Sequence, residues 1–204
     1  MRKSNKLKII VCSLLLLFNA GARAHSGYLM IPNNFSRIYM GGSAMRTKNY
    51  LAEPAHGFLL GYTKVYQFDF PLMVQAGLDV NYLASHSKQN VNNNSFQCHD
   101  RFLTTSMPIN LGLHFGNDEL QFVPYTGFNI RLNAVAKSYI GDNKTDYFDE
   151  KNAKRFVPGF NAGVDINFIM FYIGYCYTTD LIDFIPDHKS RNTYHCIKIG
   201  FNLF

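Results

Sequence analysis

The sequence contains no tryptophan and, after residue 18, no long run of apolar side chains. A membrane-spanning helix needs about 20 apolar residues in succession, so the sequence excludes such helices beyond that point. Also missing are metal-ligand spacings, a glycine-rich phosphate loop and a nucleotide-binding motif. We therefore assign no catalytic, metal-binding or cofactor-binding residue and expect no cofactor. Aromatic side chains are abundant, with 18 Phe and 13 Tyr, which is typical of β-strands and of the aromatic girdles of membrane barrels.

The first 24 residues have the pattern of a secretory signal peptide. Basic residues precede an apolar segment at 9–18, and Ala22-Arg23-Ala24 supplies the small residues of a cleavage site. We expect cleavage after Ala24 and a mature domain of residues 25–204. A retained membrane anchor is the weaker alternative, because the apolar segment is too short to span a bilayer.

Most of the net positive charge belongs to that segment. The full chain has 20 Lys and Arg against 14 Asp and Glu, a net charge of +6. Five of the basic residues lie within 1–24, so cleavage leaves 15 against 14 and a net charge of +1. A nearly neutral domain does not predict nucleic-acid binding.

Apolar and polar side chains alternate through most of the remaining sequence, which indicates β-strands because successive strand residues face opposite sides. In residues 72–82 the even positions are apolar, whereas Gln75, Asp79 and Asn81 are polar. The clearest segments are about as long as a membrane-spanning strand, roughly 9–11 residues. Eight strands are predicted, at residues 37–45, 57–66, 72–82, 101–115, 120–132, 156–166, 169–179 and 195–204.

Short and long connections alternate between these strands. The short ones lie near 69–71, 116–118 and 167–168, and the long polar ones near 48–54, 85–97, 137–154 and 180–192. This layout predicts an all-β fold, an eight-stranded antiparallel up-and-down transmembrane β-barrel with periplasmic turns and extracellular loops. A soluble lipocalin-like barrel would bury its apolar face and would not sort its connections in this way.

The last strand alternates almost to the final aromatic residue. Its outward face carries Ile197, Ile199, Phe201 and Leu203. We expect this strand to close the sheet by pairing with residues 37–45 and to be recognised by the outer-membrane assembly machinery. Because Leu203 continues the outward face, Phe204 falls outside the alternation.

Short blocks along the chain resemble the PorT-like family of small outer-membrane β-barrel proteins. The blocks are residues 57–61, 71–82, 125–127, 159–167, 173–175, 178–181 and 191–204. The resemblance extends from about residue 37 onward and implies an integral outer-membrane protein. It implies no catalytic residues, since the family shares no catalytic motif.

Six polar side chains fall on the inward face of the predicted strands. They are Asp79, His114, Arg131, Asp165, Tyr194 and Lys198. The interior of an eight-stranded barrel is just wide enough for side chains, and buried charges need partners. We therefore expect a structural polar cluster in which these groups pair, in preference to a substrate site. A solute pore would need roughly 16–18 strands.

Cys176 and Cys196 face inward on consecutive strands, and they lie directly opposite each other if residue 180 pairs with residue 192. An exported protein can form a cross-strand disulfide there. Two free thiols packed inside the barrel are the alternative.

A lipid-modifying enzyme, either an acyl hydrolase or an acyltransferase, is the rival functional hypothesis. His195 faces lipid near the outer end of the last strand with Thr193 on the same face, and Ser85-His86-Ser87 lies in a predicted extracellular loop. Neither place has an evident acidic partner, which nucleophilic catalysis of this type requires.

The sequence favours a non-catalytic barrel with a structural or surface-interaction role in the outer membrane. Its expected partners are outer-membrane lipid and lipopolysaccharide, and an envelope or host protein that binds the extracellular loops.

Overall fold

The computed structural model describes residues 33–48, 51, 53–68, 71–91, 94–117, 119–141, 143–186 and 189–204. The predicted signal peptide and its cleavage site after Ala24 lie outside these residues. None of the helices in the described ranges is long and apolar enough to cross a membrane.

Strands dominate the described chain. In order, the elements are β1 (Asn34–Thr47), β2 (Ala55–Gln67), β3 (Leu72–Val91), β4 (Asn94–Leu113), β5 (Phe115–Gly116), β6 (Leu120–Ile140), β7 (Asn143–Asp146), α2 (Tyr147–Glu150), β8 (Phe156–Phe168), β9 (Phe171–Asp180) and β10 (Asn192–Leu203).

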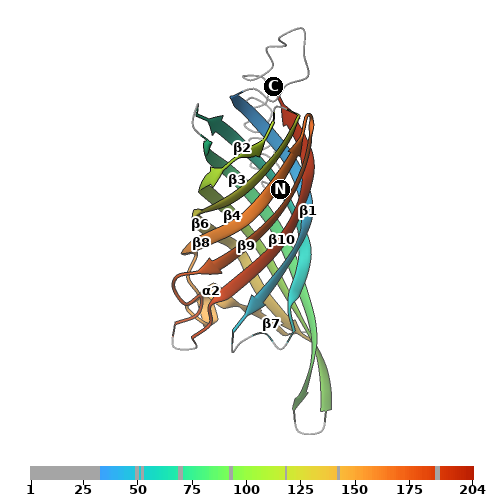
Figure 1. Ribbon diagram of the computed structural model, residues 1–204. Helices are drawn as coiled ribbons and strands as arrows, with labels where there is room; N and C mark the ends of the chain where they lie inside the picture. Colours follow the sequence, from blue (N-terminus) through green and yellow to red (C-terminus); the bar gives the residue numbers. More distant parts are fainter. Residues whose placement is uncertain are drawn as a thin grey trace, which may run out of the picture.

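The sheet closes on itself (Figure 1). Neighbouring strands follow the order β4-β3-β2-β1-β10-β9-β8-β6, and β4 pairs with β6 to complete the circle. Every pairing is antiparallel, β5 continues the path of β4 along β6, and β7 adds a short strand beside β6. Eight long strands therefore form an up-and-down barrel, which confirms the predicted fold class.

The alternation places apolar side chains outside and polar side chains inside. Ile109 and Ile197 on the outer wall are each 63% exposed, whereas Arg37 and Asp165 inside are each 1% exposed. A soluble barrel would have the reverse arrangement, while an apolar exterior is the surface that a transmembrane barrel offers to lipid.

The predicted closing contact is present. β10 pairs with β1 from Ser36 opposite Leu203 to Thr47 opposite Asn192. Phe204 turns toward the interior, where its ring meets that of Phe35 edge-on with 6.2 Å between centroids. The terminal aromatic residue therefore completes an apolar cluster inside the barrel and leaves Leu203 on the outer face.

One rim carries short turns and the other carries long connections, as predicted. The prediction of a loop at residues 85–97 is wrong, because most of that segment lies in paired strands. β3 and β4 stay paired from Leu72 opposite Leu113 to Val91 opposite Asn94, and Figure 1 shows the resulting hairpin projecting beyond the rim. A hairpin that projects past the barrel has no lipid-facing side, so it does not need the hydrophobic alternation on which the prediction relied.

Two other predicted boundaries also shift. β6 continues to Ile140, and β7 and α2 lie within the connection predicted at 137–154. The turn expected at 167–168 lies instead at Ile169 and Met170, because Phe168 still pairs with Phe171. Ile169 adopts a φ of +49°, a conformation for which the common hairpin signals are Asn and Gly, so nothing in the local sequence marked the turn.

Apolar clusters occupy both ends of the interior. At the end with short turns, Phe204 packs on four buried side chains: Phe35, Val65, Met73 and Val123. Toward the other end, Phe102 packs against Tyr147 of α2 and against Phe184. The larger cluster also includes Tyr39, Tyr172 and Tyr194, so polar and aromatic side chains are interleaved in the middle of the barrel.

A polar network in the barrel interior

Large interior side chains lie opposite glycines of the neighbouring strands. Tyr39 of β1 is in register with Gly61 of β2 and Gly200 of β10, and Lys198 is in register with Gly174. A Cβ atom at Gly61 would lie 2.2 Å from Cε2 of the Tyr39 ring. The glycines of the inward face thus make room for the charged and aromatic groups that fill the barrel.

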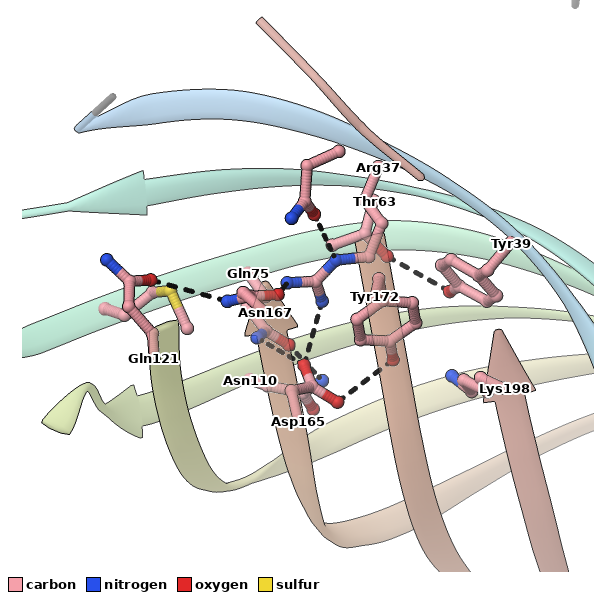
Figure 2. A network of polar contacts seen from close by, with 12 residues as sticks. Arg37, Tyr39, Thr63, Gln75, Asn110, Gln121, Asp165, Asn167, Tyr172 and Lys198 are labelled. Atoms are coloured by element: carbon pink, nitrogen blue, oxygen red, sulfur yellow. Dashed lines mark hydrogen bonds and ion pairs between the residues drawn. The ribbon is translucent and has the colours of Figure 1, made fainter. Parts of the chain in front are cut away.

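Arg37 of β1 forms the most extensive of the interior contacts (Figure 2). Its guanidinium donates from Nη1 to Oδ2 of Asp165 at 2.8 Å, from Nη2 to Oδ1 of Asn167 at 2.6 Å, and from Nε to Oδ1 of Asn202 at 3.2 Å. Its Cζ atom also lies 3.8 Å from the centroid of the Tyr172 ring. All three guanidinium nitrogens therefore have acceptors, as a buried arginine requires.

Asp165 of β8 accepts hydrogen bonds from two further strands. Gln75 Nε2 of β3 donates to its Oδ2 at 2.9 Å, and the Tyr172 hydroxyl of β9 donates to its Oδ1 at 2.9 Å. Figure 2 shows these groups converging on the carboxylate from several sides of the barrel. The Arg37–Asp165 ion pair therefore ties opposite walls together.

A second ion pair joins Lys198 of β10 to Asp79 of β3, with 3.3 Å between Nζ and Oδ2. The Tyr39 hydroxyl donates to Oδ1 of Asp79 at 2.5 Å and lies 3.0 Å from Oγ1 of Thr63. The ammonium group is 4.6 Å from the centroid of the Tyr39 ring. Lys198 thus has an anion and an aromatic face beside it, which offsets the cost of burying its charge.

A third ion pair lies nearer the end with long connections. Arg131 of β6 donates from Nη2 to Oδ1 of Asp180 at the end of β9, and its Cζ atom lies 3.8 Å from the centroid of the Tyr194 ring. Both charged side chains are almost completely buried.

The structure brings five of the six sequence-predicted residues into these three clusters. Four are ion-pair members, namely Asp79, Lys198, Asp165 and Arg131, and Tyr194 lies under the Arg131 guanidinium. His114 does not join them. It lies in the break between β4 and β5, where its backbone amide donates to the carbonyl of Pro71 at 2.9 Å.

Three interior charges were missed from the sequence: Arg37, Asp180, and Asp100, whose carboxylate accepts a hydrogen bond from the Tyr147 hydroxyl at 2.7 Å. Arg37 lies opposite in phase to outward Ile38 and Met40, so strand alternation could have identified it. Asp180 was assigned to a loop, although it continues the inward phase of Cys176 and Thr178 by two more residues. Each of the three residues lies at the edge of a predicted strand.

Little empty space remains among these groups. A cavity of about 20 Å³ lies beside Asp79, Asn81, Asn129, Arg131 and Lys198. A cavity needs roughly 10–15 Å³ to hold one water molecule, so this space suits about one water and no larger solute.

Cys176 and Cys196 are direct register partners, as predicted from the pairing of residue 180 with residue 192. Both are nevertheless free thiols. The Cys176 thiol lies 3.7 Å from Oγ1 of Thr178 and 3.8 Å from the carbonyl oxygen of Tyr177, on its own strand. The structure therefore has the free-thiol alternative, because each sulfur packs within the polar interior without a bond to the other.

The residues considered for catalysis lie apart from the interior network. Nδ1 of exposed His195 is 2.7 Å from the Tyr175 hydroxyl, while Thr193 Oγ1 donates to the carbonyl of Arg46 at 3.4 Å. Ser85 is buried and donates to the carbonyl of Glu53 at 3.2 Å. Among the described residues, neither histidine site has an ion pair with a carboxylate, and no group of three metal-binding side chains is present.

No protein-family model and no curated protein matches this sequence. Solved structures do match. Ail, the attachment invasion locus protein of Yersinia pestis, in complex with the heparin analogue sucrose octasulfate, has a TM-score of 0.52 and 16% identity over 84% of this chain and 99% of that chain. A second Ail structure gives a TM-score of 0.52 at 15% identity with the same coverage. Neisserial surface protein A gives 0.44 at 11% identity over 85% and 98%. The Ail matches show that this chain shares their barrel fold.

Proposed function

We propose that this chain is an integral outer-membrane protein, non-catalytic and closed to solutes, which makes surface contacts through the end that carries its long connections. The observation that supports this most is the filled interior. Three ion pairs are packed among buried aromatic side chains, and the cavity beside Asp79, Arg131 and Lys198 measures about 20 Å³, so this part of the interior has no room for a substrate. The remaining interaction surfaces are the apolar wall and the projecting connections.

In this proposal the end with short turns faces the periplasm and the β3–β4 hairpin faces outward. The outward partners are lipopolysaccharide and an envelope or host protein, while β10 is recognised by the assembly machinery. Export by a cleaved signal peptide and membership of the PorT-like family both stay predictions.

Two epitope insertions test the location and orientation. One tag replaces residues 92–93, between paired Val91 and Asn94, and a matched tag follows Asn117 in a short turn of the other rim. We expect intact cells to bind antibody at the first tag only, and the purified protein to migrate differently on a gel before and after boiling. Labelling at the second tag alone, or identical migration with and without boiling, would contradict the proposal.

The enzyme alternative has its own test. In this proposal His195 is an interfacial side chain bonded to Tyr175, so His195→Ala should leave the acylation pattern of outer-membrane lipid unchanged in mass spectra. The matched control is His56→Ala, which removes another histidine of the same outer wall. A shift in lipid acylation with His195→Ala alone would favour the enzyme.

A further inference from the structure

The outer wall has a shallow depression along β1 where the strand presents small side chains. It is lined by Gly42 and Ala44 of β1, Gly57 of β2, and Tyr175 and His195 among others, and its volume is about 340 Å³. A Cβ atom added at Gly42 would meet nothing within 4 Å. The depression is therefore open space on a wall that elsewhere carries large apolar side chains.

A second depression of about 450 Å³ lies next along the same strands, toward the rim with long connections, and three cationic side chains line it. Arg46, Lys48 and Arg191 line it together with Thr193. Arg46 lies two residues beyond Ala44 on the same face of β1, which places it about 7 Å further along the strand. Register makes the two sites adjacent, because Ala44 pairs with His195 and Arg46 pairs with Thr193.

Hydrogen bonds connect the chain segments that carry the three cations. The Lys48 amide donates to the carbonyl of Arg191 at 3.1 Å, and Thr193 Oγ1 donates to the carbonyl of Arg46. Arg191 has an ion pair with Asp183 at 3.6 Å, yet its side chain is still 60% exposed. Among the residues that the structure describes, Arg46 and Lys48 have no ion-pair partner. The cluster therefore has positive charge available for an external anion.

We propose that these adjoining depressions form a binding site for one molecule of the lipid A part of lipopolysaccharide. An acyl chain lies over Gly42 and Ala44, and a phosphate group contacts Arg46 and Lys48. The inference rests on the proposed outer-membrane location, since the site needs a phosphorylated lipid in the outward leaflet.

The chemistry of the two depressions selects this occupant. A free anion or soluble glycan would use the cations and leave the apolar depression empty, whereas an uncharged lipid would use only the depression. A ligand that uses both has an apolar chain joined to an anionic headgroup. Arginine and lysine are the usual phosphate-binding side chains, and lipid A is the phosphorylated, acylated lipid of the outward leaflet.

The test uses the folded full-length barrel in detergent and counts bound lipid by native mass spectrometry. The probes are lipid A with both phosphates, the same lipid with its phosphates removed, and phosphatidylglycerol. We expect one lipid A per barrel and a loss of affinity of about tenfold or more in the double variant Arg46→Gln/Lys48→Gln, since both charge-assisted contacts to the phosphate are lost. This loss should disappear with dephosphorylated lipid A.

Two matched controls accompany these variants. Lys144→Gln/Lys151→Gln removes two exposed positive charges near the same rim, and it should bind lipid A like the unmodified protein. Gly42→Leu fills the depression and should weaken binding of both forms of lipid A, while Ala76→Leu enlarges another exposed residue of the outer wall and should not.

Three results would overturn the site. The first is an unchanged affinity for lipid A in Arg46→Gln/Lys48→Gln. The second is phosphatidylglycerol binding as tightly as lipid A and losing the same affinity in that variant. The third is a dimer of the barrel that Gly42→Leu disrupts. The gel shift on boiling identifies any variant that fails to fold. If the tagged protein is absent from the outer membrane, the proposed function fails; if it is present there and these variants bind normally, the lipid site alone fails.

Discussion

Single residues inside the barrel work in complementary pairs of large and small side chains. Tyr39, Lys198 and Asp79 are in contact, and each is in register with a glycine on a neighbouring strand. The charge of Lys198 is tolerated because Asp79 and the Tyr39 ring lie beside it. Removing the cation should therefore destabilise the barrel by leaving a buried charge unpaired. Filling the space at a glycine should destabilise it by overpacking.

Replacing Lys198 with Met should leave Asp79 buried without its cation. Loss of one partner of a buried pair typically costs about 3–5 kcal/mol, so we expect unfolding at lower urea concentration, measured by the fraction of protein that keeps its unboiled gel mobility. The double variant Lys198→Met/Asp79→Asn should recover much of the loss, because Asn is neutral and still accepts from Tyr39. Equal stability of the single variant and the unmodified protein would contradict the electrostatic explanation.

A methyl group at Gly61 should be poorly tolerated. Gly61→Ala would place Cβ 2.2 Å from the Tyr39 ring and 2.4 Å from Oδ1 of Asp79, and overpacking of this kind costs about 1–3 kcal/mol. Gly42→Ala is the matched control, since its Cβ would meet nothing within 4 Å. The same urea titration should separate the two variants, and equal midpoints would argue against tight packing around Tyr39.

At the scale of elements, strand ends depend on what lies beside them. β3 loses its partner β2 beyond Ala84 but remains paired with β4 to Val91. β4 in turn keeps β6 as a neighbour as far as Cys98. The part of the hairpin beyond Ser87 and Cys98 therefore pairs only with itself and contributes nothing to barrel closure.

Replacing residues 88–97 with Asn-Gly should leave the barrel intact. Ser87 and Cys98 are register partners, and a two-residue Asn-Gly turn suits such a pair. We expect the shortened protein to keep its gel shift on boiling and its resistance to urea. The contrasting variant removes Gly116 and Asn117 from a short turn in which Gly116 has a φ of +121°, and it should impair folding.

The whole molecule combines an apolar exterior, a polar filled interior and two different rims. The interior ion pairs link β1 to β8, β3 to β10 and β6 to β9. They link strands that are not neighbours in the sheet, and the proposed function accordingly assigns partner contacts to the outer wall and to the rim with long connections.

A closed interior predicts the absence of porin-like channels. Reconstituted in a planar bilayer, the protein should give no current steps of the size seen with barrels of roughly 16–18 strands. An open porin serves as the positive control in the same bilayer. Steady porin-sized steps would contradict the filled interior and remove the main support for the proposed function.

Strand number, the inward or outward direction of each side chain and the register of Cys176 with Cys196 could be derived from the sequence. They follow from the two-residue period of a strand and from connection lengths, both of which are local properties. The pairing of Arg37 with Asp165, 128 residues apart, is not local, because it depends on the stagger of strands around the closed barrel. The same holds for the meeting of Arg46 and Arg191 at the seam where the first and last strands pair, and for the turn of Phe204 into the interior. The sequence by itself determined which residues face inward, and only the closed tertiary structure decided which of them meet.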